Sequence, residues 1–282
     1  MDCLTDLHTH SKASDGTKSP TELVRIAKDT GLTSIALTDH DTIDGLAEFN
    51  EAGVEYNIET ISGIELAAAY KNTELHIVGL FIDEKNKDLI ASMKYIVNER
   101  EERNKKMLKV LKRLGVDISI EELEKNAGGN IITRAHYANV LTQKGYVQNN
   151  DEAFNKYIGS GKPGYVKRDT LTPKNCIEAI RNSGGIPILA HATLYGFNYL
   201  EIHSIVGELK KYGLMGMETL YSTYTQKQAN EIRKICEHYN LLKSGGSDFH
   251  GDNKPDIAIG KGRGNLKIPQ DFVDKMKEAL HQ

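Results

Sequence analysis

Seven short apolar segments, each followed or interrupted by a histidine or a carboxylate, constrain the fold of this 282-residue chain more than any other feature. Their length and their content of branched side chains are typical of buried strands. The segments are Leu4–His8, Thr33–Thr38, Thr60–Glu65, Leu75–Ile82, Ile186–Ala190, Leu214–Thr219 and Leu241–Gly245. Because helical patterns separate several of them, we predict an α/β chain with a parallel sheet, and seven or so repeats predict closure into a barrel.

Helix-start signals support this alternation of strands and helices. Ser19 to Glu22 forms a capping box with a proline at the first helical position, and Gly31 follows as a stop signal. Similar starts occur at Thr172, where the helix is predicted to run to Gly184, and at Thr225, where it is predicted to run through Tyr239. Each predicted helix lies between two of the apolar segments.

The alternation stops between about residues 83 and 168. Residues 88–114 have helical spacing of apolar side chains along a charged sequence, and further helices are predicted to begin near residues 119, 134 and 151. We therefore predict two parts: a catalytic barrel from residues 1–84 and 169–282, and a mainly helical insertion domain, residues 85–168, that caps the active site. The charge-rich segment Asn98–Lys106 is predicted to be a solvated helix face.

Composition narrows the class of protein. The net charge of −3 and the pI near 6.4 argue against a globally cationic nucleic-acid coat protein. Cys3, Cys176 and Cys236 are widely spaced and form no Cys-x-x-Cys pair, which indicates reduced, packed thiols. No apolar run reaches 18 residues, so no membrane partner is expected. These features predict a soluble, cytoplasmic protein.

Histidines and carboxylates at the predicted strand ends indicate a metal site. His8 and His10 are spaced i and i+2, so on a strand both imidazoles point to the same face and can reach one cation. In a parallel barrel the carboxyl ends of the strands meet at one face. We expect the following side chains to join the pair there: Asp15, His40, Glu65, His76, His191, Asp248 and His250.

Taken in order, these motifs resemble those of the PHP family, named for polymerase and histidinol phosphatase. The resemblance implies a distorted (β/α)7-type PHP barrel with an inserted, mainly helical subdomain. It also implies three ligand groups, with Glu65 bridging the first two: His8, His10, Glu65 and Asp248; Glu65, His76 and His191; Asp15, His40 and His250. Many family members have histidine where this chain has Asp15, and a carboxylate favours manganese, iron or magnesium over zinc at that position.

Two further segments make the chain similar to one branch of the family. Ile132–His136, Gly161–Val166 and the position of the insertion resemble phosphoesterases that remove the 3′-phosphate of nucleoside 3′,5′-bisphosphates, some of which also degrade short RNA from its 5′ end. This resemblance implies two to three divalent metal ions, most often manganese, with iron, zinc or magnesium as alternatives. The expected partner is a nucleotide or short RNA with a terminal phosphate, not duplex DNA, and the expected assembly is a monomer or a small homo-oligomer.

Several residues are candidates for catalysis and substrate binding. Arg134 and His136, with the ligands Asp248 and His191, are the predicted catalytic residues; the predicted substrate contacts are Arg134, His136, Lys162 and Glu218. A planar guanidinium can bind two phosphate oxygens at once, which favours Arg134 as a phosphate clamp. Each substrate-contact candidate could instead have only a structural role. Arg134 could be an ordinary residue at a helix start, His136 a capped or packed side chain, Lys162 part of a solvated turn, and Glu218 a packing residue. Asp39 and Asp41 are predicted to orient His40 or a neighbouring loop.

The leading hypothesis is therefore a metal-dependent phosphoesterase. A histidinol phosphate phosphatase and a PHP module that binds metal without catalysis are the alternatives. An amidohydrolase would share the barrel and the metals, but it usually needs a bridging lysine or another histidine pattern, and the sequence has neither in the right place.

Overall fold

The computed structural model describes residues 4–127, 129 and 131–281. These residues form one eight-stranded sheet in the order β7-β6-β5-β4-β3-β2-β1-β8. The strands are β1 (Leu4–Asp6), β2 (Ser34–Leu37), β3 (Glu59–Tyr70), β4 (Thr73–Leu80), β5 (Ile186–Leu189), β6 (Gly216–Tyr221), β7 (Leu242–Gly246) and β8 (Ile268–Pro269). Backbone contacts between β1 and the end of β7, such as Leu7 N–H to Gly245 O, nearly close the sheet into a barrel. The predicted α/β barrel is confirmed, and each of the seven apolar segments overlaps a strand.

Ten α-helices surround or extend this barrel in the described part of the chain. They are α1 (Pro20–Thr30), α2 (Leu46–Tyr56), α3 (Lys87–Arg113), α4 (Ile120–Ala127), α5 (Arg134–Gln143), α6 (Asn150–Ala153), α7 (Pro173–Asn182), α8 (Tyr199–Tyr212), α9 (Gln226–His238) and α10 (Asp271–Leu280). The Ser19 capping box begins α1, and Gly31 ends it in the left-handed conformation, as predicted. Thr172 and Thr225 are the N-caps of α7 and α9, and each hydroxyl accepts a hydrogen bond from a backbone N–H in the first turn; at Thr225 this is part of a capping box with Gln228.

The sheet is not wholly parallel, which corrects the sequence-based expectation. β4 pairs antiparallel with both β3 and β5, and β8 pairs antiparallel with β1. The reason is local: only Lys71 and Asn72 separate β3 from β4, too few residues for the crossover that parallel strands need. Lys71 takes a positive φ of 52° in this tight turn.

The hydrophobic core has three clusters. The largest lies where the sheet packs against the surrounding helices, and a smaller one includes Leu7, Ile61 and Ile188 together with Val273 and Met276 of α10. A third cluster belongs to the second half of α3 and to α4, α5 and the π-helical turn Phe154–Ile158 that follows α6. The helical insertion therefore has apolar packing of its own.

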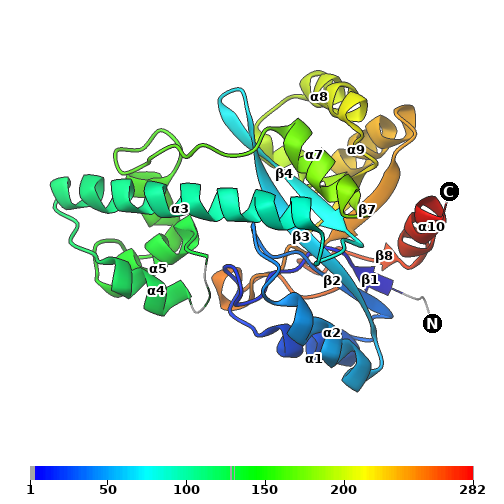
Figure 1. Cartoon of the computed structure of the whole chain (residues 1–282), viewed down its shortest axis with the longest axis horizontal. Helices are drawn as coiled ribbons and strands as arrows, with labels where there is room; N and C mark the ends of the chain where they lie inside the picture. Colours follow the sequence, from blue (N-terminus) through cyan, green and yellow to red (C-terminus); the bar gives the residue numbers. More distant parts are fainter. Residues whose placement is uncertain (1–3, 128, 130, 282) are drawn as a thin grey trace.

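The long helix α3 joins the insertion to the barrel. Figure 1 shows α3 running from the sheet to α4 and α5, which lie far from α8, α9 and α10. Its first half contributes Leu89, Met93 and Ile96 to the main core, and its second half contributes Met107 and Leu111 to the insertion core. A domain boundary near residue 85 therefore stays a prediction, because α3 packs on both sides of it.

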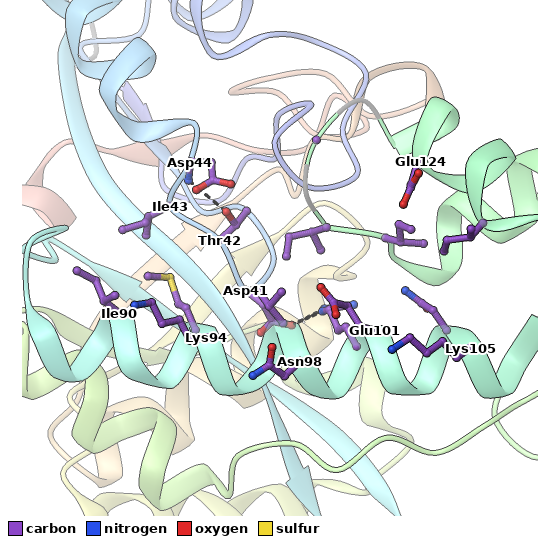
Figure 2. Close-up of a pocket in the computed structure, with 18 residues that line it drawn as sticks. Asp41, Thr42, Ile43, Asp44, Ile90, Lys94, Asn98, Glu101, Lys105 and Glu124 are labelled. Atoms are coloured by element: carbon purple, nitrogen blue, oxygen red, sulfur yellow. Dashed lines mark hydrogen bonds and ion pairs between the residues drawn. The ribbon is translucent and has the colours of Figure 1, made fainter.

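A cleft of about 1110 Å³ lies beside α3, between this helix, residues 41–44 after β2, and Ile120, Glu124, Ile131 and Ile132 of the insertion. Figure 2 shows its lining, in which Ile43 and Ile90 alternate with charged side chains such as Asp44 and Glu101. None of the predicted metal ligands lines this cleft. Among the described residues, no helix has the length and apolar character needed to cross a bilayer.

Candidate metal centre

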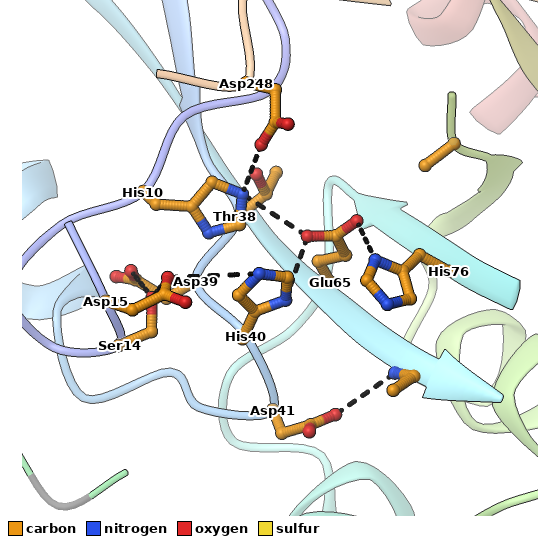
Figure 3. Close-up of polar contacts among 12 residues, drawn as sticks. His10, Ser14, Asp15, Thr38, Asp39, His40, Asp41, Glu65, His76 and Asp248 are labelled. Carbon is orange, nitrogen blue, oxygen red and sulfur yellow. Dashed lines mark hydrogen bonds and ion pairs between the residues drawn. The ribbon is translucent and has the colours of Figure 1, made fainter. Parts of the chain in front are cut away.

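All nine predicted ligand side chains come together at one site (Figure 3 shows six of them). Their nitrogen and oxygen atoms form four overlapping groups, and within each group these atoms lie within 4.8 Å of one another. The groups are His10, Asp15, His40 and His250; His8, Glu65 and His191; His8, His10 and Asp248; and His40, Glu65 and His76. Side chains separated by more than 200 residues in the sequence therefore share one cluster.

Glu65 lies at the centre of the cluster, and its two oxygens face different histidines. Oε1 is 2.8 Å from His76 Nδ1 and 3.0 Å from His191 Nε2. Oε2 is 3.0 Å from His40 Nδ1 and 3.2 Å from His8 Nε2. A carboxylate with ligand-capable groups around each oxygen is suited to bridge two cations about 3.5–4 Å apart.

Asp15 and Asp248 supply carboxylates on the other side of the cluster. Asp15 Oδ1 is 3.3 Å from His250 Nε2 and 3.9 Å from His40 Nε2. Asp248 Oδ1 is 3.2 Å from His10 Nε2. The ligand groups predicted from the sequence are thus close in space. They are not separate, because His10 and His40 each belong to two of the four groups in the structure.

The central donor atom fits bound cations because it is buried without a hydrogen bond of good geometry. Within the described residues, Glu65 Oε2 makes no hydrogen bond, although ring nitrogens of His8, His10 and His40 lie 3.0–3.3 Å away. An unsatisfied buried polar group costs about 1–3 kcal/mol, so such atoms need a ligand. Imidazole and carboxylate donors without a thiolate suit manganese, iron or zinc.

The pKa shifts differ across the cluster: although burial opposes it, the neighbouring Glu65 carboxylate raises the pKa values of His8, His40 and His76. Burial, together with the imidazoles of His250 and His40, lowers the pKa of His10 to about 4, so this ring is neutral at physiological pH. Burial alone would raise the pKa of Glu65, but the imidazoles of His8, His40 and neighbouring residues hold it well below its usual value. The cluster therefore combines a neutral imidazole with an ionised carboxylate.

Strand ends position most of the ligands, with two exceptions. His8, His191 and Asp248 each follow a strand by two residues, and the last two have positive φ angles of 27° and 56°. Non-glycine residues in this region are strained, which is common at functional sites. Glu65 was also expected at a strand end, but it lies within β3 because the β3–β4 hairpin extends this strand past the cluster; His76, expected inside an apolar segment, lies within β4.

A second set of polar residues supports the ligands from behind. Glu218 Oε1 is 2.7 Å from His8 Nδ1, and its Oε2 accepts a hydrogen bond from His191 N–H. Tyr221 donates to Asp248 Oδ2, and Lys254 Nζ lies 2.7 Å from the same oxygen. These contacts fix which nitrogen or oxygen of each ligand faces the cluster.

Among the described residues, neither Asp39 nor Asp41 hydrogen-bonds to the ring of His40. Asp39 accepts hydrogen bonds from the Ser11 and Ser14 hydroxyls, which holds the loop that carries Asp15. Asp41 forms ion pairs with guanidinium groups from the insertion side of the cavity, described next.

A cavity of about 360 Å³ opens over the cluster and brings cationic side chains to the opposite wall. The metal-ligand wall includes Asp15, His40, His76 and His250. The facing side chains, which we call the arginine wall, are Arg100, Arg103, Arg134 and Arg168. Glu74 connects the two walls, since its Oε1 lies 3.5 Å from His76 Nε2 and 3.8 Å from Arg134 Nη2.

Asp41 holds two members of the arginine wall in place. Its Oδ2 is 2.9 Å from Arg100 Nε and 3.0 Å from Arg168 Nη2. Other donors on this wall have no partner: within the described residues, Arg103 Nε and Arg168 Nη1 are buried and make no hydrogen bond. Burial, reinforced by the neighbouring Arg100, lowers the pKa of Arg103 to about 9.

Three of these arginines were missed by the sequence analysis. Arg100 and Arg103 lie in the segment predicted to be a solvated helix face, but both are buried, with 8% and 5% of their surface exposed. The prediction of a solvated face is correct for the residues on the other side of the helix, such as Glu102 and Lys105, which are exposed. A signal was present, because Ile96, Arg100, Arg103 and Met107 share one helical stripe.

The predicted substrate contacts lie at different distances from the cavity. Arg134 lines it, with its guanidinium 5.5 Å from the centre of the Tyr165 ring. His136 is buried behind it and accepts a hydrogen bond from Thr133 N–H as part of a capping box. Glu218 contacts His8 and His191, and Lys162 is exposed on a turn; neither lines the cavity.

Comparison with known proteins identifies the family. The sequence profile of the PHP domain matches residues 6–162. The chain belongs to the PHP family. A 5′-3′ exoribonuclease of Haemophilus influenzae is 37% identical over 87% of this chain and 89% of its own length. A 3′,5′-nucleoside bisphosphate phosphatase of Chromobacterium violaceum is 30% identical over 90% of both proteins.

A solved structure of a second protein has the same fold. This Chromobacterium violaceum protein, described as an amidohydrolase with bound sulfate and no metal, matches 99% of this chain and 97% of its own with a TM-score of 0.87 at 28% identity. The chain is thus a PHP phosphoesterase with a candidate multi-metal site, which agrees with the predicted enzyme class.

Proposed function

We propose that this protein removes the 3′-phosphate of nucleoside 3′,5′-bisphosphates and, by the same reaction, cleaves short RNA from its 5′ end. The observation that carries this proposal is the pairing of the ligand cluster with the arginine wall across one cavity of about 360 Å³. The names of the relatives, an exoribonuclease and a bisphosphate phosphatase, agree with a substrate that has two phosphates. They favour neither histidinol phosphate as a substrate nor a module without catalysis.

We propose two to three divalent ions at the cluster, with manganese as the physiological metal. The first group would use His8, His10, Glu65 and Asp248; the second Glu65, His76 and His191; and the third Asp15, His40 and His250. When bound, such ions withdraw charge from phosphoryl oxygens and lower the pKa of water, so that hydroxide forms near neutral pH.

The arginine wall would bind the phosphate that does not react. Arg103 Nε and Arg168 Nη1 are buried donors that lack partners within the described residues, and a phosphate provides several strong acceptors. Arg134, the most accessible of the four, would close the contact as the substrate enters. With the 5′-phosphate on this wall, the 3′-phosphate would lie over the cluster.

The protein's own side chains would then direct hydrolysis. Water adds to phosphorus, the P–O3′ bond breaks, and its electron pair stays on O3′, which takes up a proton. Glu218 would orient His8, and Lys254 would balance the charge of Asp248. His136 accepts a hydrogen bond at Nδ1, so its neutral ring carries the proton at Nε2; we propose it as a hydrogen-bond donor to a substrate phosphate.

We also propose that residues 85–168 act as an insertion domain that covers the site, since α3 and α5 supply Arg100, Arg103 and Arg134 to the cavity. Nothing in its position supports a substrate contact by Lys162, which is exposed outside the cavity.

Phosphate release from adenosine 3′,5′-bisphosphate tests the proposal. Purified protein loaded with manganese should release inorganic phosphate and leave adenosine 5′-monophosphate, while histidinol phosphate and adenosine 5′-monophosphate should react much more slowly. The Asp248→Asn variant should lose both activity and bound metal, as measured by elemental analysis. Protein with confirmed bound metal that releases no phosphate from the bisphosphate would contradict the proposal.

A further inference from the structure

A second cavity of about 590 Å³ adjoins the catalytic cavity, and Asn150 and Asn253 line both. It lies where the loop after β1 meets α4 and α5 of the insertion. We call it the amide groove, after the four asparagines in its lining. Its other polar lining residues are Lys12, Thr17, Lys125, His136, Thr142 and Gln143.

Hydrogen bonds between the side-chain amides hold the groove in one shape. Asn139 Nδ2 lies 3.3 Å from both Asn126 Oδ1 and Asn253 Oδ1, and Asn150 Nδ2 donates to Asn139 Oδ1 at 2.6 Å. Asn253 in turn donates to the backbone oxygen of Asp15, a predicted metal ligand. The network thus connects the insertion to the edge of the metal cluster.

The charge of the amide groove suits a polyanion. No carboxylate is among its lining residues, whereas Lys12 and Lys125 are, and neither ammonium makes an ion pair or hydrogen bond within the described part of the chain. Side-chain amides can both donate and accept, so they can contact phosphates, ribose hydroxyls and base edges. A neutral His136 ring adds a further donor at Nε2.

The lining of the larger cleft beside α3 carries both signs of charge, with Lys94 and Lys105 beside carboxylates (Figure 2). The cleft shares Arg100 with the catalytic cavity, but its lining includes Asp44, Glu101 and Glu124 and many aliphatic side chains. A nucleic-acid strand that leaves the catalytic cavity would meet carboxylates there, and it would meet none in the lining of the amide groove.

We propose that the amide groove binds the part of an oligoribonucleotide that continues beyond the scissile phosphate. This inference rests on the proposed function, which puts the 5′-phosphate on the arginine wall. None of those four arginines lines the groove, so the first nucleotide and the remaining strand have separate places. On hydrolysis the phosphate stays with the downstream fragment as its new 5′-phosphate, and the first nucleotide departs with a free O3′.

The double variant Lys12→Ala/Lys125→Ala tests the groove. Its kcat/KM for a 5′-phosphorylated hexaribonucleotide should fall about tenfold, whereas its kcat/KM for adenosine 3′,5′-bisphosphate should change less than twofold. Fluorescence anisotropy measures how the double variant binds a 5′-phosphorylated hexaribonucleotide that is labelled at its 3′ end. The affinity of the variant should depend less on salt concentration than that of the wild type. Each lost phosphate contact on a single strand lowers the slope of log K against log salt by about 0.7.

The matched control is Lys94→Ala/Lys105→Ala, which removes the same charge from the larger cleft. It should leave both the hexaribonucleotide kinetics and the salt slope unchanged. Loss of oligonucleotide binding in this control alone would contradict the proposal that the amide groove binds RNA. An equal decrease in kcat/KM for both substrates in the groove variant would contradict it as well.

The groove and the proposed function can fail separately. A protein that hydrolyses the bisphosphate but neither cleaves nor binds the hexaribonucleotide overturns the groove and keeps the phosphatase. A protein that binds the oligonucleotide through Lys12 and Lys125, yet hydrolyses neither substrate with metal present, keeps the groove as a binding site and contradicts the proposed reaction.

Discussion

The two walls of the catalytic cavity are built in different ways. The metal-ligand wall collects side chains from distant strands, and its central residue, Glu65, lies within 3.3 Å of ring nitrogens of five histidines. The arginine wall comes from α3, α5 and the segment that returns to the barrel; Asp41 pairs with Arg100 and Arg168, and Glu74 lies 3.8 Å from both Arg134 and Arg168. We infer that the barrel carries the chemistry and the insertion carries substrate selection, so changes in the two walls should have different effects.

The largest effect is expected from Glu65→Gln. The amide keeps the size of the side chain but removes the charge between two ligand groups, so bound metal should fall and activity should decrease by about three orders of magnitude, several kcal/mol of transition-state stabilisation. Elemental analysis and phosphate release measure both. Glu59→Gln, at the partly exposed start of the same strand where Glu59 pairs with Lys277, is the matched control and should change neither.

Asp41→Asn should affect the arginine wall and leave the metal-ligand wall intact. It leaves two buried guanidinium groups without their carboxylate, and losing one partner of a buried ion pair costs about 3–5 kcal/mol of folding stability. Asparagine tolerates the positive φ of 55° at this position, so the backbone should persist. Chemical denaturation should detect the loss, and KM for the bisphosphate should rise.

The control for Asp41 is Asp256→Asn, which removes a carboxylate from an exposed pair with Arg263 and should cost less than about 1 kcal/mol. If Asp41→Asn lowered metal content as strongly as Glu65→Gln does, the distinction between the walls would be wrong.

Arg103→Met should produce an activity loss together with a stability gain. Arg103 Nε is buried and lacks a partner within the described residues, so a methionine of similar length avoids the cost of burying a cation and should raise the melting temperature. Losing one charged contact to phosphate should lower kcat/KM for the bisphosphate about 10- to 100-fold. Arg113→Met, at the exposed end of α3, is the control and should change neither quantity.

These walls also differ in how much of them the sequence could predict. The strands and the nine candidate ligands follow from short apolar runs with polar ends, because both signals lie within a few residues. The antiparallel direction of β4 was not predicted, since the Lys71–Asn72 turn has neither glycine nor proline. Arg100 and Arg103 were misplaced because burial of a charged side chain depends on a distant partner, here Asp41 and the cavity itself.

The smallest effect is expected from Lys162→Ala, which tests a contact predicted from the sequence alone. Lys162 is exposed on the turn after the π-helical segment and lies outside the cavity lining, so kcat/KM for the bisphosphate should stay within twofold of the wild type. Arg134→Ala, on the accessible edge of the arginine wall, provides the contrast and should raise KM while metal content stays constant. A loss in Lys162→Ala as large as in Arg134→Ala would mean that the turn at residues 159–164 closes onto bound substrate, and the arginine wall would then extend beyond the four guanidinium groups.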